Sequence, residues 1–324
     1  MISTVVARTT APFIYLAPLK SITDSLFRRV FGAHFGGVDA AVAPFINPQR
    51  ASSYPDKLVR DLLPERNREI TVIPQILNNE PQGFSALARR LHELGYQEIN
   101  WNLGCPARQV VKKQRGAGLL PHPDTVCRLL DTVLPELPGR LSIKMRVGLH
   151  DEAEAAALLP RLNDYPLSEI IIHPRLGDEF YRALADPDRF ERCMTLTGHR
   201  LCYNGDIRTM ADYLRLAHRF TGINRWMIGR GLLANPFLGE EIKGRSPAKQ
   251  DRRWRLISFH DELFGALQEH VSGPGHLLGR LKQVWIYFIG AFPDNQSQLK
   301  KITRAGSLDS YRRVVDTLFL KPPL

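Results

Sequence analysis

Residues 98–106, EINWNLGCP, join a strand-like run to a cysteine that stands between a glycine and a proline. A basic run broken by glycines, KKQRGAG, follows at residues 112–118. A cysteine that only fills a core seldom occurs in such a setting, whereas a thiol beside cations is well placed to react near an anionic ligand. Cys105 is therefore a candidate reactive residue, provided that the rest of the chain builds a pocket around it.

Short β-rich runs of this kind occur eight times in the first 230 residues. They lie at residues 13–17, 38–43, 70–76, 98–103, 141–147, 169–173, 200–203 and 225–228. Stretches with a helical spacing of apolar residues, such as 84–94 and 123–133, separate most of them. Strands that alternate with helices pair in parallel, and eight such units favour an α/β fold of the TIM (β/α)8 barrel type. A doubly wound sheet is the alternative, but no Gly-x-Gly-x-x-Gly follows the first strand.

The pattern changes after Pro236, where residues 254–270, 276–289 and 308–320 have helical periodicity. We expect a catalytic barrel domain at residues 1–242 and a smaller all-α domain at 243–324, with 244–249 as linker. The second domain has 14 lysines and arginines against 7 acidic residues, in a chain with a net charge of +11. This excess favours a polyanionic partner, although a solvated charged face would also explain it.

The four cysteines show neither a Cys-x-x-Cys pair nor zinc-finger spacing, so we expect no disulfide framework, no metal site and a reducing cytoplasm. Cys127, Cys193 and Cys202 fall in helix-like or buried stretches, which is typical of packing. Residues 1–10 contain no apolar run long enough for a signal peptide, so we expect none, and no run in the sequence is long enough to span a membrane.

Polar residues collect where the predicted strands end, which is where TIM barrels carry their active sites. Lys144 and Arg146 lie two residues apart on one strand, so both side chains point to the barrel interior or mouth. Buried cations need a partner, and we favour an anionic or electron-rich ligand over barrel carboxylates, which are scarce there. His173 and Gln75 end or interrupt apolar runs; each is either a satisfied core residue or part of the same polar ring.

Glycine turns follow the last two predicted strands, at 203–207 (YNGDI) and 227–231 (MIGRG). Such turns either bind a phosphate with backbone amides, where Arg230 would add charge, or are ordinary turns. A phosphate site beside a ring of amide, lysine and histidine would suit flavin mononucleotide, FMN. Cys105 would then be a proton donor or nucleophile opposite the flavin. The cations of residues 112–115 could lower its pKa or hold a substrate phosphate.

With these residues identified, the chain resembles the tRNA-dihydrouridine synthases over nearly its whole length. The matching motifs are Ala17-Pro18-Leu19, Asn102-Leu103-Gly104-Cys105-Pro106, Lys144-Met145-Arg146, His173, Asn204-Gly205-Asp206 and Gly229-Arg230-Gly231. The resemblance implies an FMN enzyme that takes hydride from NADPH and passes it to C6 of a uracil in tRNA, while Cys105 protonates C5. The target uridine must leave its stack to reach the flavin.

The resemblance also implies roles for individual residues. The expected cofactor-binding residues are Ala17, Pro18, Leu19, Gln75, Lys144, His173, Asn204, Gly205, Asp206, Gly229 and Arg230. The expected substrate- or tRNA-binding residues are Asn47, Asn102, Arg146, Tyr181, Arg280 and Lys282.

Two further motifs resemble the bacterial C-type branch, which acts on the tRNA D-loop: FYRA at 180–183 and RLKQ at 280–283. The chain departs from the family at Leu19, where a methionine is usual, at Lys20, where an acidic residue is usual, and at Pro174-Arg175-Leu176, where Gly-Arg-Thr is usual.

Two rival functions remain open at this stage. An FMN-dependent reductase of free pyrimidines, similar to dihydroorotate dehydrogenase, would explain the barrel, flavin and cysteine but not the basic tail. A barrel that only binds RNA would explain the tail but not the combination of Cys105, Lys144 and His173. We expect a monomeric, cytoplasmic tRNA-dihydrouridine synthase.

Overall fold

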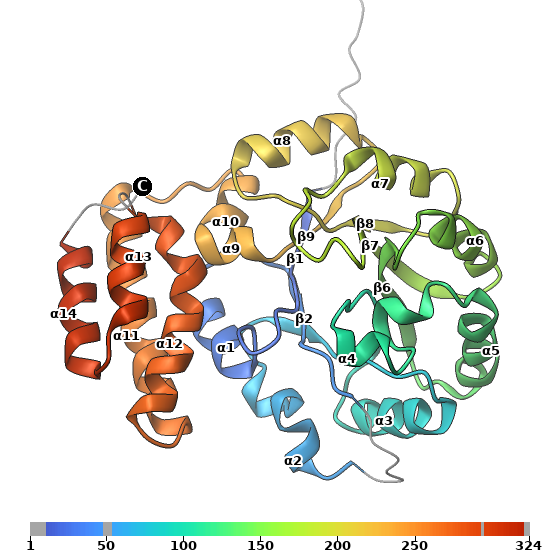
Figure 1. The fold of residues 1–324 in the computed structure, drawn as a ribbon, viewed down its shortest axis with the longest axis horizontal. Helices are drawn as coiled ribbons and strands as arrows, with labels where there is room; N and C mark the ends of the chain where they lie inside the picture. The colour runs from blue at the N-terminus through green and yellow to red at the C-terminus, as the bar shows by residue number, and fades with distance from the viewer. Residues whose placement is uncertain (1–10, 48–53, 293–294, 321–324) are drawn as a thin grey trace, which may run out of the picture.

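The barrel consists of parallel strands surrounded by helices (Figure 1) in a computed structural model that describes residues 11–47, 54–292 and 295–320. Within these residues one sheet runs in the order β3-β2-β1-β9-β8-β7-β6-β5-β4. Its strands are β1 Phe13–Leu16, β2 Ala40–Val42, β3 Thr71–Ile73, β4 Gln75–Ile76, β5 Glu98–Leu103, β6 Arg140–Gly148, β7 Leu167–Leu176, β8 Leu201–Tyr203 and β9 Arg225–Ile228. Every predicted run therefore contains a strand.

Pro74 divides the predicted strand 70–76 into β3 and β4, because proline has no backbone N–H to donate to a ladder. β3 pairs with β2 and β4 pairs with β5, so the two ends of the sheet meet at this proline. The Pro74 carbonyl still accepts a hydrogen bond from the Asn100 N–H at 2.8 Å. The nine-stranded sheet of the described residues is thus a nearly closed barrel in which β3 and β4 together take the place of one strand, which confirms the predicted TIM-barrel fold and excludes the open sheet.

Helices cover the outside of the barrel (Figure 1). They are α1 Ser25–His34, α2 Asp56–Val59, α3 Pro81–Glu93, α4 Arg108–Val111, α5 Pro123–Val133, α6 Ala153–Leu162, α7 Pro187–Met194, α8 Met210–Arg219, α9 Arg230–Ala234 and α10 Leu238–Ile242. Successive side chains of β5 point alternately toward the helices and into the barrel. Trp101 points outward and packs on Phe84 of α3, at 5.9 Å between ring centroids. Asn100 and Asn102, the neighbours of Trp101 on either side, therefore point into the barrel.

Apolar side chains fill the barrel interior and leave its C-terminal end for polar groups. The interior cluster contains Tyr15, Ala17, Ala40, Val42, Ile73, Ile171, Cys202 and Met227. Near the N-terminal ends of the strands, Arg225 donates hydrogen bonds to the buried Glu169 carboxylate and to the Tyr15 hydroxyl. The barrel interior is therefore a packed core and not a channel, which leaves the mouth of the barrel for polar groups and a ligand.

The C-terminal region is helical, as predicted, and packs beside α1 (Figure 1). It contains α11 Lys249–His270, α12 Pro274–Phe288, α13 Asn295–Arg304 and α14 Leu308–Phe319. Tyr311 lies at its centre, where its hydroxyl contacts His260 Nε2 at 2.7 Å and accepts a hydrogen bond from Trp285 at 2.6 Å. In the described part of the chain, no helix combines the length and the apolarity needed to cross a bilayer.

Candidate active site

Two adjoining cavities lie at the C-terminal end of the barrel. The larger has a volume of about 270 Å³, and the smaller, on the β8 and β9 side, about 50 Å³. Of the predicted site residues, the larger cavity is lined by Pro18, Leu19, Gln75, Asn102, Cys105, Lys144, Arg146, His173 and Tyr181. The smaller is lined by Ala17, Pro18, Leu19, Lys144, His173, Tyr181, Asn204, Gly205, Gly229 and Arg230. The fold thus brings most of the predicted residues together.

Asn102 holds the backbone of the candidate catalytic cysteine. Its Oδ1 accepts hydrogen bonds from the N–H groups of Gly104 at 3.0 Å and Cys105 at 2.9 Å. Its Nδ2 donates to Gln75 Oε1 at 2.8 Å, and Gln75 Nε2 donates to Asn100 Oδ1 at 2.7 Å. This chain of amides links β4, β5 and the cysteine loop, so the half-buried Cys105 stands on a fixed support.

The basic loop after Cys105 packs against the same backbone. The Ala117 N–H donates to the Cys105 carbonyl at 3.0 Å, and Gly116 adopts φ +56° beside it. Arg115 is bonded to Asn79 Oδ1 at 3.0 Å and to Asn47 Oδ1 at 2.5 Å. Asn47 is exposed and lines neither cavity, so its contact with tRNA stays a prediction. The guanidinium of Arg115 is bonded to these two asparagines of the protein.

Lys144 of β6 is a half-buried cation that lines both cavities. Burial, reinforced by the charge of Arg146, lowers its pKa from 10.5 to about 8. Within the described residues its ammonium group forms no hydrogen bond and no ion pair. Its charge is therefore available to a ligand, and the expectation that this ligand is anionic or electron-rich stays a prediction.

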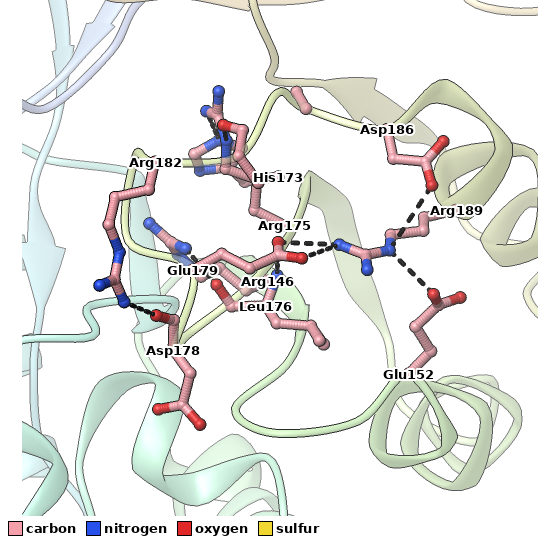
Figure 2. A network of polar contacts seen from close by, with 12 residues as sticks. Arg146, Glu152, His173, Arg175, Leu176, Asp178, Glu179, Arg182, Asp186 and Arg189 are labelled. Carbon is pink, nitrogen blue, oxygen red and sulfur yellow. Dashed lines mark hydrogen bonds and ion pairs between the residues drawn. The ribbon is translucent and has the colours of Figure 1, made fainter.

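Arg146, two residues along β6, supports the loop that follows β7. Its Nη1 donates to the Leu176 carbonyl at 2.5 Å and its Nη2 to the Phe180 carbonyl at 2.8 Å (Figure 2). Its guanidinium lies 5.4 Å from the ring centroid of Tyr181. Arg146 thus fixes the loop that presents Tyr181; its contact with uracil stays a prediction.

His173 contacts Arg175, which was not among the predicted site residues and belongs to the segment Pro174-Arg175-Leu176 that departs from the family pattern. Arg175 Nη1 contacts His173 Nε2 at 2.9 Å (Figure 2). Burial, and then the charges of Lys144 and Arg146, hold the pKa of His173 well below its usual value, so the ring is neutral. The period-two alternation that paired Lys144 with Arg146 also pairs His173 with Arg175, so the sequence contained the signal.

The smaller cavity is bounded by the two glycine turns. A Cβ at Gly205 would stand 2.3 Å from the hydroxyl of the buried Tyr203, so this turn has no room for a side chain. One at Gly229 would make a tight contact, 3.2 Å, with the Cβ of Ala17. Asp206 lines neither cavity, but its carboxylate accepts a hydrogen bond from Arg230 at 2.7 Å. Close backbone and an oriented guanidinium give this cavity the character of an anion site.

The two predicted RNA-binding cations of the helical region have protein partners instead. Arg280 pairs with Asp24, the N-cap residue of α1, at 2.5 Å, and Lys282 donates to the Ala305 carbonyl at 2.6 Å. Neither lines the two cavities, so their contact with RNA stays a prediction. The same helix α12 does supply Tyr287 to the larger cavity. No sequence signal indicated this residue, because only the docking of α12 brings it there.

Comparisons with known proteins agree with this geometry. The family model described as dihydrouridine synthase matches residues 15–308. The chain is 29% identical over 253 residues to the tRNA-dihydrouridine(16) synthase of Ralstonia nicotianae, covering 75% of this chain and 77% of the relative. It is also 29% identical over 314 residues to a probable tRNA-dihydrouridine synthase of Staphylococcus epidermidis, covering 94% and 93%.

Solved structures share the fold alone, at 10% sequence identity. Histamine dehydrogenase from a Rhizobium species superposes with a TM-score of 0.56 over 78% of this chain and 49% of that chain. A mutant of morphinone reductase in complex with tetrahydroNAD superposes with a TM-score of 0.52 over 74% and 89%. Since the family model spans the barrel and most of the helical region, the chain belongs to the dihydrouridine synthase family of flavin-dependent oxidoreductases, whose substrate is tRNA.

Proposed function

We propose that this enzyme reduces uridine 16 in the D-loop of tRNA to 5,6-dihydrouridine, with FMN as cofactor and NADPH as reductant. The observation that carries the proposal is the position of Cys105, a half-buried thiol at the mouth of a cavity that Lys144 and His173 also line. The choice of position 16 is supported by the names of relatives such as that from Ralstonia nicotianae.

The residues present fit an FMN group. Lys144 and His173 would face the electron-rich pyrimidine edge of the ring system, and Lys144 has no protein anion of its own among the described residues. The amides of the Gly205 and Gly229 turns, with Arg230, would hold the phosphate. Lys144 lines both adjoining cavities and Arg230 lines the smaller one, an arrangement that matches a ligand with one electron-rich end and one anionic end.

The flavin, once reduced by NADPH, would supply a hydride to C6 of the uracil. Cys105 then delivers a proton to C5, which quenches the developing enolate and gives the saturated ring. Asn102 fixes the backbone that leads into Cys105, and the Ala117 N–H holds the Cys105 carbonyl, so the proton donor needs little reorganisation. Tyr181, on the loop held by Arg146, stands beside the cavity, where an aromatic ring could stack on a base that has left its helix.

The proposal is tested in a strain that lacks the gene and is complemented with wild type or with Cys105→Ala. Mass spectrometry of nuclease-mapped tRNA should show a gain of two hydrogen atoms at uridine 16 with wild type only. The purified variant should still bind FMN and accept electrons from NADPH, because the thiol acts after the flavin is reduced. A Cys127→Ala variant, altered within α5, should behave as wild type.

Unchanged dihydrouridine content in the deletion strain would refute the proposal. Reduction of free uracil without tRNA would favour the free-pyrimidine reductase instead. Loss of dihydrouridine at a position other than 16 would retain the reaction and correct the site.

A further inference from the structure

We propose that Arg175 is a positioning residue that holds His173 as the neutral tautomer protonated on Nδ1, so that the ring presents a fixed N–H donor to the cavity. The geometry at the ring's other nitrogen carries this inference. Arg175 Nη1 lies 2.9 Å from His173 Nε2. A guanidinium can only donate, so Nε2 must hold a lone pair, and the proton of the neutral ring must lie on Nδ1.

Arg175 cannot readily turn away from this contact, because its other nitrogens are also bonded. Its Nε donates to the Ala183 carbonyl at 2.8 Å, and its Nη2 donates to the Asp206 carboxylate. Asp206 is itself fixed by the Ala185 N–H at 3.0 Å and by Arg230. Arg175 is 1% exposed, so water does not compete for these bonds. The side chain is thus a rigid connection between β7, the loop after it and the smaller cavity, which Arg175 also lines.

The groups that face His173 also disfavour a charged ring. Besides Arg175, they are the cations of Lys144 and Arg146 from β6 and of Arg230 from the start of α9, together with the Tyr181 ring at 6.0 Å between centroids. The Asp206 carboxylate, which binds Arg175 and Arg230, forms no hydrogen bond with the imidazole and so does not offset these charges at the ring. A protonated ring would meet four like charges and would turn an N–H toward the Arg175 N–H.

The other side of the ring is available to a ligand. Within the part of the chain that the structure describes, His173 Nδ1 has no hydrogen-bond partner, and the residue lines both cavities. A neutral N–H donor beside the Lys144 ammonium is complementary to a carbonyl oxygen or ring nitrogen that gains negative charge. Identification of that acceptor as the pyrimidine edge of FMN rests on the proposed function; the tautomer does not.

The direct test is nitrogen NMR of protein labelled with ¹⁵N-histidine, with and without FMN. The chain has ten histidines, and the His173 signals are identified by their loss in His173→Asn. We expect Nδ1 to be protonated and Nε2 unprotonated, without titration between about pH 6 and 8, where an ordinary histidine changes charge. A wild-type ring that is protonated on Nε2, or that titrates in this range, overturns the proposal whatever the variants do.

Variants separate positioning from simple folding. Arg175→Met should give a mixture of tautomers or a titrating ring, and weaken FMN binding by up to about tenfold, the value of one hydrogen bond. Arg175→Lys keeps a positive charge and a hydrogen-bond donor, so it should restore part of the wild-type tautomer spectrum and part of the FMN affinity that Arg175→Met loses. Arg182→Met is the matched control on the same loop, since that exposed guanidinium bonds the Asp178 carbonyl and not the histidine.

A well-folded Arg175→Met protein with the wild-type His173 spectrum would show that Arg175 does not set the tautomer. The spectrum recorded without FMN is the one that decides the tautomer, so this outcome is independent of whether the enzyme reduces tRNA. The tautomer proposal can therefore be refuted while the synthase function holds, and the synthase function can be refuted while the tautomer proposal holds.

Discussion

At the scale of single residues, Lys144 couples ligand binding to pH. With a pKa of about 8 in the flavin-free protein, it is charged below that pH and increasingly neutral above it. An anionic or electron-rich ligand binds the charged form, so the FMN dissociation constant should rise with pH through about 8, approaching tenfold per unit. Fluorescence titrations above pH 7, where the FMN phosphate keeps its charge, would measure this rise.

Lys144→Gln should bind FMN more weakly and without this pH dependence, because it has no proton to lose. Lys112→Gln alters an exposed lysine of the basic loop and should keep the wild-type profile. A wild-type affinity that stays flat across pH 8 would mean that Lys144 does not face the flavin.

At the scale of elements, the loop from Lys112 to Leu119 determines where Cys105 stands. Gly116 has φ +56°, and a Cβ there would lie 2.7 Å from the Cys105 carbonyl oxygen. Gly116→Ala should therefore cost about 1–2 kcal/mol of unfolding free energy and slow uridine reduction, because the thiol must shift. Gly198→Ala, where a Cβ meets nothing within 4 Å, is the control.

Thermal unfolding and single-turnover reduction of tRNA measure the two effects of Gly116→Ala. Normal turnover in a destabilised variant would show that the loop supports the fold without positioning the thiol.

Periodicity alone was enough to predict the barrel and most of the residues at its mouth. Lys144 and His173 follow apolar runs, and the closure of a parallel barrel brings strand ends together wherever they lie in the sequence. Pro74 shows what apolar periodicity left out: the run 70–76 was predicted as one strand, although the proline within it lacks the N–H that a continuous strand would donate. Tyr287 shows a second limit: it reaches the cavity only through the packing of α12, which is a tertiary property that no local pattern encodes.

At the scale of the whole molecule, the barrel and the helical region share an aromatic interface. Phe259 of α11 lies 5.9 Å from Phe27, 6.3 Å from Phe31 and 5.1 Å from Phe35, between ring centroids, and is 1% exposed. Phe259→Ala should cost about 3–5 kcal/mol, and barrel and helices should unfold in one shifted transition.

Trp254→Ala changes a residue of the same helix that is 66% exposed, and should move the unfolding midpoint little. Denaturant unfolding followed by bound-flavin fluorescence and by helical circular dichroism gives the comparison. Two separated transitions in the wild type would contradict a shared cooperative unit.

The net charge of +11 favours electrostatic binding of tRNA, which carries a negative charge on each phosphate. Affinity for tRNA should fall steeply with salt, since each phosphate neutralised contributes about 0.7–0.9 to the logarithmic slope, whereas FMN affinity should change far less. Lys112 and Lys113 are exposed beside the cysteine loop and form no ion pair with a described residue. Replacing both with glutamine should reduce the slope by up to about 2 if they meet phosphates at the mouth of the cavity.

The matched control replaces Lys300 and Lys301, two exposed lysines on α13, with glutamine. Both double variants remove two positive charges, so a general loss of charge would affect them equally, whereas local phosphate contact would separate them. Filter binding of tRNA at several salt concentrations measures both slopes. A larger effect at Lys300 and Lys301 would place the RNA on the helical region rather than at the loop after Cys105, and equal effects would indicate a diffuse electrostatic surface.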